Sequence, residues 1–519
     1  MTTKKELVQF LLAKKIIVTG KLMAMIKEQN DQETEKLYTD IQNKDDDSIR
    51  KIIFSYLQTE KQKEQQNKDV EKENTLATNS AQEQNKEATN DASDIEEVKE
   101  GTVSIISSFT TKEVNKEIQD FVSYFNERYK TLERLLRGRQ ELDNVTAIKR
   151  ALQKEEREHV AIIGIVKEIN ETKNKNIIIT LEDSTGEMKA LVSKNKREIY
   201  EAGKSLVRDE VVGIVGVAGK GIIFVEKIVW PEVPVYNELK KSPIEEYAIF
   251  LSDIHVGSKQ FLAAAFEKFL KWINGEAGDE KQRALVKKIK YVFIVGDVVD
   301  GVGIYPGQEH DLEMTDIYDQ YAACGALLAQ IPKHMKIIIC PGNHDAMRLA
   351  EPQLPLYEDM AKPLYDLPNA VMVSNPAMVN VGRTEGFPGI SVLMYHGYSF
   401  DYYIANVDEI RNNGGYDRAD LVMKYLLQRR HLAPTHASCV YIPFRDYDPM
   451  VISKIPDIFA TGHLHKTSVS SYRNITLICG SCWQGKTAFQ EKMGHNPEPA
   501  RVPLVNLQTR EVKILKFME

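Results

Sequence analysis

The most constraining feature of the sequence is a series of short apolar runs, each followed by side chains that can bind a metal ion. The runs and the residues after them are YAIFLS before Asp253 and His255, YVFIVG before Asp297, KIIIC-PG before Asn343, His344 and Asp345, ISVLMY before His396, and DIFATG before His463 and His465. Continuous apolar runs of this length are typical of buried strands. From Tyr247 onward they alternate with helical patterns, which predicts a layered α/β domain over residues 241–519.

These side chains are expected to meet in space, because open α/β sheets gather the carboxyl ends of their strands at one edge. Each fragment alone is a weak signal, since a single histidine after a strand is more often a hydrogen-bonded core residue than a ligand. The chain has 11 histidines, and nearly half of them follow these runs. The ordered set therefore predicts a metal site.

The residue types narrow the choice of metal. Imidazole, carboxylate and amide oxygen together suit Mn²⁺, Fe²⁺ or Zn²⁺, and they argue against an all-oxygen calcium site or a thiolate cluster. The candidate ligands are too many for one ion but fit two ions that share a bridging carboxylate. Two ions about 3.5–4 Å apart can clamp the attacking and leaving oxygens of a displacement at phosphorus. The pattern therefore predicts hydrolysis of a phosphoester.

The ordered motifs DxH, GD, GNHD, H and GHxH resemble the pattern of the calcineurin-like metallophosphoesterase superfamily. The resemblance implies a first ion held by Asp253, His255, Asp297 and His465, and a second held by Asp297, Asn343, His396 and His463. It also implies that His344 faces the scissile phosphate as a general acid or transition-state stabiliser, and that Asp345 orients the imidazole of His344.

The spacers between the motifs indicate a substrate. Segments such as VGDVVDGVGIYPGQEHDLEMTDIYDQY, PGNHDAMRLAEPQ and VISKIPDIFATGHLH resemble the small subunits of archaeal family D DNA polymerases over roughly residues 155–519. The resemblance implies a 3′→5′ exonuclease that proofreads for a separate large polymerising subunit. It implies two divalent ions, with Mn²⁺ expected and Fe²⁺, Zn²⁺ or Mg²⁺ as alternatives. The expected partners are the large subunit, in a heterodimer or higher assembly, and DNA with a 3′ end. A sliding clamp or other replication proteins are further candidates, although no clamp-binding consensus is evident.

Two rival functions remain open. The related small subunits of eukaryotic replicative polymerases share the architecture, have lost the metal ligands and act as structural adaptors. The intact ligand set argues against a purely structural role here, because buried charged groups without a metal would be unpaired. The second rival is a stand-alone metallophosphatase or phosphodiesterase, which would have little use for the N-terminal regions described next.

The N-terminal part of the chain changes character several times. Residues 1–57 carry helical patterning and predict a small helical module. Residues 58–110 are rich in Glu, Lys, Gln and Asn, with no aromatic residue between Tyr56 and Phe109. Such a segment cannot bury enough apolar surface to offset its chain entropy, so we expect a disordered linker. A solvated single helix is the alternative for its first half.

Two further segments precede the α/β domain. Residues 111–156 return to helical periodicity and predict a helical connector. Residues 157–240 contain three β-rich runs, a helix-like stretch and two more β-rich runs, which is the order of an OB-fold barrel. OB-fold barrels often bind single-stranded nucleic acid through aromatic side chains, but these runs are nearly free of them. The predicted fold class is therefore multidomain α+β: a helical module, an OB-fold barrel and a layered α/β (calcineurin-like phosphoesterase) domain.

The composition sets weaker limits. A chain of 519 residues is too long for one ordinary domain. Its formal net charge of −7 does not advertise nucleic-acid binding, but a local basic patch would suffice for it. No apolar run approaches the length of a membrane span. The five cysteines are an odd and scattered set, which argues against a secreted disulfide framework and favours a cytoplasmic protein.

Several residues outside the proposed ligand set are also candidates. Arg429, Arg430 and His431 could contact phosphate or the partner subunit; alternatively, they form a solvated helix end whose cations lie near the negative end of the helix dipole. Asp401 could accept a hydrogen bond from His396, because imidazoles that bind metals usually need an acceptor.

Two aromatic residues complete the set of candidates. Tyr305 and Tyr398 could stack on a terminal base of the DNA. The alternative is local packing, which is more common for aromatic side chains in loops.

Overall fold

The computed structural model describes residues 4, 31–42, 44, 49, 103–110, 115–487, 490–491 and 495–518. The chain divides into two units, Met1–Ile95 and Glu96–Glu519. In the first unit, helix α3 (Asp31–Ile41) is described, and it buries Leu37 and Ile41. Most of the predicted helical module, and residues 58–102 of the predicted linker, lie outside the described residues. All the elements below belong to the second unit.

The end of the predicted linker is a strand, so its predicted boundary at residue 110 is wrong. Strand β1 (Ser104–Ser108) pairs antiparallel with β11 (Ala377–Val381) of the C-terminal domain. Phe109, directly after β1, is buried, and its backbone N–H donates to Ser374 Oγ at 2.7 Å. The polar composition of the long segment before it concealed this short β-rich stretch, whose hydrogen-bond partner lies far away in the sequence.

A closed barrel follows, with the order of elements predicted from the sequence. Its strands are β2 (His159–Glu171), β3 (Ile177–Asp183), β4 (Gly186–Val192), β5 (Val211–Gly219) and β6 (Ile222–Val229). They pair in the order β2-β3-β4-β6-β5, and the barrel closes from β5 back to β2. Helix α7 (Arg197–Lys204) lies between β4 and β5 in the chain, and the short α6 (Ile148–Ala151) packs on the barrel core.

The C-terminal domain contains two sheets that pack face to face. The first has the order β10 (Ala370–Met372), β9 (Lys336–Cys340), β8 (Ile289–Val295), β7 (Tyr247–Leu251), β16 (Arg501–Asn506), β17 (Val512–Lys516). The second has the order β1, β11, β12 (Ile390–Met394), β13 (Ile458–Thr461), β15 (Ile475–Cys479), β14 (Ser468–Tyr472). Side chains such as Phe250, Phe293, Met394 and Ala460 form the core between them.

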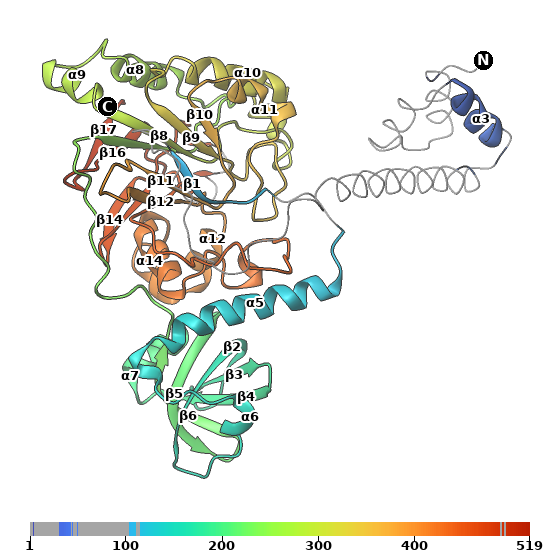
Figure 1. Ribbon diagram of the computed structural model, residues 1–519, viewed down its shortest axis with the longest axis vertical. Helices are drawn as coiled ribbons and strands as arrows, with labels where there is room; N and C mark the ends of the chain where they lie inside the picture. Colours follow the sequence, from blue (N-terminus) through green and yellow to red (C-terminus); the bar gives the residue numbers. More distant parts are fainter. Residues whose placement is uncertain are drawn as a thin grey trace, which may run out of the picture. The chain divides into compact units, whose positions relative to one another are not determined.

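Helices cover the outer faces of both sheets (Figure 1). On the first sheet lie α8 (Ala263–Ile273), α9 (Glu280–Val286), α10 (Ile317–Leu328) and α11 (Glu358–Tyr365). On the second lie α12 (Phe400–Asn406), α13 (Asp408–Asn412) and α14 (Ala419–Arg429). The central strands are therefore buried on both faces, which explains their continuous apolar runs. No described helix is long and apolar enough to cross a membrane.

This arrangement corrects the expectation of a single sheet edge. Strands β7, β8 and β9 run parallel in the first sheet, and β12 and β13 run parallel in the second. The five apolar runs thus belong to two different sheets. An apolar run looks the same in the sequence whether its second face is covered by a helix or by another sheet, so the sequence could not distinguish the two arrangements.

Helix α5 (Ile118–Arg137) joins the barrel to the C-terminal domain. Its buried residues recur every four positions and are Asp120, Tyr124, Arg128, Leu132 and Leu136. Leu132 and Leu136 pack in an apolar cluster with β2 and β5 residues of the barrel. Nearer the start of the helix, the Arg128 Nε–H donates to Asp448 Oδ2 at 2.7 Å, and the Tyr124 hydroxyl donates to Asp448 Oδ1 at 2.7 Å.

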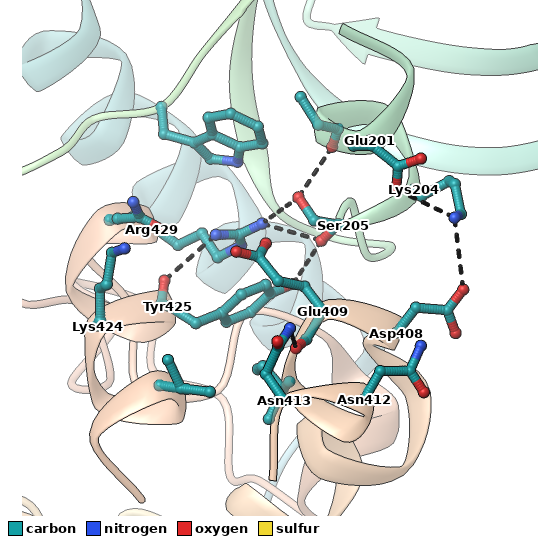
Figure 2. Close-up of a pocket in the computed structure, with 15 residues that line it drawn as sticks. Glu201, Lys204, Ser205, Asp408, Glu409, Asn412, Asn413, Lys424, Tyr425 and Arg429 are labelled. Carbon is teal, nitrogen blue, oxygen red and sulfur yellow. Dashed lines mark hydrogen bonds and ion pairs between the residues drawn. The ribbon is translucent and has the colours of Figure 1, made fainter. Parts of the chain in front are cut away.

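A second joint between these domains is centred on Arg429 at the end of α14 (Figure 2). The guanidinium carbon of Arg429 lies 3.3 Å from the ring centroid of Tyr425. Its Nε lies 3.1 Å from Glu210 Oε2, and its Nη2 donates to the Ser205 backbone oxygen at 2.9 Å. Ser205 and Glu210 lie in the segment between α7 and β5 of the barrel. The two joints therefore bind the barrel to the C-terminal domain through buried arginines.

Candidate metal centre

The candidate ligands come from loops that directly follow the parallel strands, and the backbone there is strained. Five of these ligands have left-handed φ angles: Asp253 (51°), His255 (53°), Asp297 (52°), His463 (70°) and His465 (54°). Left-handed backbone in a non-glycine residue costs free energy of order 1–3 kcal/mol and tends to occur at functional sites. The loops thus place these side chains at the expense of local stability.

The first group of ligands surrounds His255 and His465. Their Nε2 atoms lie 3.1 Å apart. The Nε2 atom of His465 lies 3.4 Å from Asp253 Oδ1, and that of His255 lies 3.8 Å from Asp297 Oδ2. Asp253, His255 and His465 are all buried, and their ligand atoms lie within 4.8 Å of one another. One cation can therefore be reached by all of them.

The second group consists of atoms that accept hydrogen bonds and face one another. Asn343 Oδ1 lies 3.0 Å from His396 Nε2 and 3.0 Å from His463 Nδ1. The remaining nitrogen of each ring faces a group that only accepts: His396 Nδ1 faces the Val295 backbone oxygen at 2.9 Å, and His463 Nε2 faces Asp401 Oδ2 at 3.0 Å.

This geometry is a test of whether a cation fits. Neutral His396 and His463 each place their one N–H on an acceptor, so both inward nitrogens present lone pairs to Asn343 Oδ1. In this neutral form three acceptors meet in a partly buried space. A cation at that point satisfies all three, so the residues fit a metal ion.

Asp297 connects the two groups. Its Oδ2 lies 3.2 Å from His396 Nε2 as well as 3.8 Å from His255 Nε2. Burial opposes ionisation of Asp297, but the positive charges of His396 and His344 hold its pKa well below the ordinary value. Burial likewise opposes protonation of His396, yet Asp297 raises the pKa of His396 to about 10, so without a metal ion a proton occupies the place that a cation would take. The centre therefore attracts positive charge, and Asp297 is placed to bridge two cations.

Other residues hold the ligand rings in position. In the first group, His255 Nδ1 lies 2.9 Å from Asp300 Oδ1, and His465 Nδ1 lies 2.9 Å from the side-chain amide of Gln490. Partners of this kind fix the ring orientation of metal-binding histidines, and their loss usually costs 10–100-fold in affinity or activity. Each of the four candidate histidine ligands has such a partner.

His344 lies at the more exposed edge of the centre, although a ring nitrogen of His344 comes within 4.8 Å of ligand atoms of His255 and Asp297. Its side chain is 21% exposed, whereas that of His255 is 1% exposed. Its Nδ1 lies 2.9 Å from the Asp300 backbone oxygen, which leaves Nε2 as the atom that can meet a substrate. Burial lowers the pKa of His344 below its ordinary value.

The role predicted for Asp345 is wrong. Its carboxylate does not orient the imidazole of His344 but accepts backbone N–H groups of Asp297 at 2.9 Å, Val298 at 3.1 Å and Gly342 at 2.8 Å. Asp345 therefore fastens the loop after β9 to the loop after β8. The residue that contacts the His344 ring is Asp300, and sequence reasoning missed it. The available signal was a second carboxylate three positions after Asp297.

Asp401 contacts a candidate ligand, as predicted, but the ligand is His463 rather than His396. Asp401 bonds His463, whereas His396 bonds the backbone of Val295. Of the two predicted aromatic contacts, Tyr398 lies beside the centre, with its ring 5.9 Å from that of His463. Tyr305 hydrogen-bonds Asp311 at 2.9 Å, which is local packing in its own loop.

The predictions for Arg429, Arg430 and His431 are wrong in both alternatives. All three residues are at most 3% exposed, so they are neither a DNA-binding surface nor a solvated helix end. Arg429 forms the joint with the barrel. Arg430 donates to the backbone oxygens of residues 452 and 453, and His431 Nε2 lies 2.8 Å from Asp448 Oδ2. No sequence pattern indicates that the barrel and α5 cover this end of α14.

Comparison with known proteins now adds to this geometry. The family model of the B-type subunits of DNA polymerases alpha and epsilon matches residues 248–470, a segment that contains every candidate ligand. The DNA polymerase II small subunit of Methanothermobacter thermautotrophicus is 38% identical over 401 residues, which are 77% of this chain and 80% of that relative. The chain belongs to the DNA polymerase II small-subunit family. The resemblance to archaeal family D small subunits is thereby confirmed.

Other members of the small-subunit family match over a similar range. The Archaeoglobus fulgidus small subunit is 38% identical over 79% of this chain and 80% of the relative. The Pyrococcus furiosus small subunit is 41% identical over 77% of this chain, but the match spans only 64% of the relative. Among solved structures, a novel archaeal phosphodiesterase is 11% identical over 52% of this chain with a TM-score of 0.26, which is too low to support an argument.

Proposed function

We propose that this chain is a 3′→5′ exonuclease with two divalent cations, and that it proofreads for the large subunit of a family D DNA polymerase. The observation that carries this proposal is the convergence of Asp297, Asn343, His396 and His463, whose side-chain nitrogen and oxygen atoms face one another at 3.0–3.2 Å. Family membership supports DNA as the substrate and a polymerase as the partner. The types of ligands and their order along the chain resemble those of the calcineurin-like metallophosphoesterases.

The proposed assignment of ligands follows the two groups. Asp253, His255, Asp297 and His465 hold one cation, and Asp297, Asn343, His396 and His463 hold the other. Mixed nitrogen and oxygen ligands suit Mn²⁺, Fe²⁺ or Zn²⁺, and the resemblance to the family D small subunits favours Mn²⁺. When bound, such a pair supplies Lewis-acid stabilisation of the oxygens exchanged at phosphorus.

The chain's own residues supply the remaining chemistry. Asp300 fixes the His344 ring through its backbone oxygen, so that Nε2 of His344 points to the scissile phosphate. When its ring is protonated, which the charge of the phosphate favours against burial, His344 donates a proton or a hydrogen bond from Nε2 to the leaving 3′-oxygen. Asp345 keeps the loops of Asn343 and Asp297 at a fixed separation through their backbone N–H groups.

A structural role accompanies the activity in this proposal. The buried joints at Arg128 and Arg429 hold the barrel and the C-terminal domain as one body. Such a body can serve as a scaffold for the large polymerising subunit. A purely structural adaptor, however, would gain nothing from carboxylates and imidazoles gathered this closely.

The test uses the purified full chain and single-stranded DNA labelled at the 5′ end. We expect stepwise shortening from the 3′ end that requires Mn²⁺, and no such shortening when the 3′ end is blocked. His344→Ala should abolish cleavage with nearly unchanged metal content, whereas His463→Ala should lose metal as well. Cleavage by His344→Ala at the wild-type rate would refute the role of His344. Absence of bound metal in the wild type would refute the whole centre.

A further inference from the structure

A cavity of about 350 Å³ adjoins the metal centre. It lies beside α12, α13 and the loop that carries His463 and His465. The side chains that matter for its chemistry are Ile404, Arg411, Tyr416, Leu464, Lys466 and His495. Leu464 stands between the two candidate ligands of its loop, so one wall of the cavity is the outer side of the metal centre.

The aromatic wall of the cavity is connected to the centre by direct contacts. The Tyr416 hydroxyl interacts with Asp401, which holds the Nε2 atom of His463. The Tyr416 ring lies 4.2 Å from the ring of His495, with 40° between the two planes. The charge of His495 in turn interacts with Asp401 and His463. A flat ligand on this pair therefore lies next to the cation that His463 helps to hold.

The cavity is also lined by positively charged side chains that could bind a phosphate. Lys466 directly follows His465, and its Nζ lies 2.7 Å from Asp417 Oδ1. The Asp417 side chain is 70% exposed, and exposed ion pairs contribute little to stability. Arg411 is likewise half exposed and is paired with Asp408. Because Asp417 is largely exposed, a phosphate can replace it as the partner of Lys466, whose own side chain is 16% exposed.

An aromatic pair, an apolar floor of Ile404 and Leu464, and positively charged side chains are together what a nucleotide requires. We propose that this cavity binds the 3′-terminal nucleotide of the DNA, with its base on Tyr416 and His495 and its phosphate oxygens towards Lys466. This inference rests on the proposed function and names the part of the substrate that is held.

The test measures binding of dAMP to the full chain in Mn²⁺ by calorimetry, with deoxyribose 5-phosphate as the probe that lacks a base. Stacking of one base on an aromatic side chain usually contributes enough for about a tenfold change in affinity. Wild type should bind dAMP about tenfold more tightly than deoxyribose 5-phosphate. Tyr416→Ala should lose this difference, and Tyr416→Phe should retain it because the ring remains.

Two further variants complete the design. Lys466→Ala should weaken binding of dAMP and of deoxyribose 5-phosphate alike, because both carry the phosphate. Tyr318→Ala, which removes a 54% exposed tyrosine on α10, is the control and should bind both ligands as the wild type does. Bound Mn²⁺ is measured in every variant, so that a loss of metal is distinguished from a loss of stacking.

The outcomes separate this inference from the proposed function. If Tyr416→Ala binds dAMP as tightly as the wild type, or the wild type does not prefer dAMP, the cavity does not hold the base and the inference is overturned. The proposed function stands in that case as long as the wild type shortens DNA from its 3′ end. If the wild type leaves 3′ ends intact, the proposed function fails whatever the binding data show, and the inference fails with it.

Discussion

Two clusters of this molecule each contain a buried aspartate and a buried histidine, but they balance their charge in different ways. Around Asp297, carboxylate, imidazole and amide oxygen face one another. Around Asp448, the carboxylate accepts from Tyr124 Oη at 2.7 Å, Arg128 Nε at 2.7 Å and His431 Nε2 at 2.8 Å. Both carboxylates are buried.

The difference lies in where the positive charge comes from. Burial opposes ionisation of Asp448, but the guanidinium of Arg128 holds its pKa below the ordinary value. The chain thus supplies its own cation there, and every acceptor has a donor. Around Asp297 the positive charge is a proton on His396, whose pKa Asp297 raises to about 10, and a bound cation can replace that proton. Burial of histidine and aspartate alone therefore does not identify a metal site. The buried carboxylate must also lack an arginine or lysine of the chain that neutralises it.

The strongest test of this difference makes the same substitution, aspartate to asparagine, in both clusters. Asp297→Asn removes the bridging carboxylate, so it should lose most bound metal and lower the rate of 3′-end cleavage on the order of 10³-fold. Metal content by mass spectrometry and cleavage of labelled DNA are the measurements. A variant with full metal content and full rate would show that Asp297 bridges nothing.

The matched change Asp448→Asn should act on stability instead. It leaves Arg128 buried without its counter-charge, so the free energy of unfolding should fall by about 3 kcal/mol. Urea denaturation of the full chain measures this loss. Bound metal per folded chain should equal that of the wild type. Loss of metal without loss of stability would mean that the two clusters had been assigned the wrong way round.

The pH dependence of stability sharpens the description of the Asp448 cluster. Burial, with the nearby charge of Arg128, lowers the pKa of His431 to about 4 despite the opposing effects of Asp448 and Asp209. His431 therefore binds a proton near pH 6.5 in the unfolded chain, whereas in the folded chain it does so only near pH 4. Stability present above pH 6.5 is lost as the pH falls towards 4, which amounts to about 2 kcal/mol between pH 7 and pH 5. His431→Gln should remove this slope; an unchanged slope would assign it to other groups.

The smallest expected effect concerns Asp300, which contacts the rings of His255 and His344. Asp300→Asn keeps the shape of the side chain and the backbone oxygen that fixes His344, but it weakens the hydrogen bond to His255. Affinity for Mn²⁺ should fall about tenfold, the low end for partners of metal-binding histidines. Competition with a fluorescent chelator measures this affinity. No change would indicate that His255 needs no support from Asp300.

Much of the fold and of the candidate centre could be predicted from the sequence. The strand runs, the barrel order and the convergence of Asp253, Asn343 and His396 all follow from local patterns and from general rules of α/β topology. The predictions failed where the outcome depended on contacts between distant segments. Ser104–Ser108 pairs with β11 across more than half of the chain, and Arg429 is buried by a barrel segment near Ser205.

Within the centre, the sequence identified side chains better than their partners. His396 and His463 were both predicted as ligands. Asp401, however, was predicted to bond His396, and it bonds His463 instead. Hydrogen-bond partners depend on the orientation of each ring, and this orientation is set by packing between the two sheets. Asp345 was misassigned for the same reason, since its targets are backbone N–H groups that no sequence pattern displays.

The sequence by itself determined which chemical groups the chain can bring to a site, because apolar runs followed by ligands already specify buried strands with reactive ends. Only the tertiary structure decided which buried histidines face a carboxylate that an arginine already neutralises and which face further acceptors. His431 and His396 look alike in the sequence, yet the first meets a carboxylate already neutralised by Arg128 and the second meets other acceptors. That distinction depends on the charge within a few ångströms in space, and neighbours in space are set by folding rather than by position in the chain.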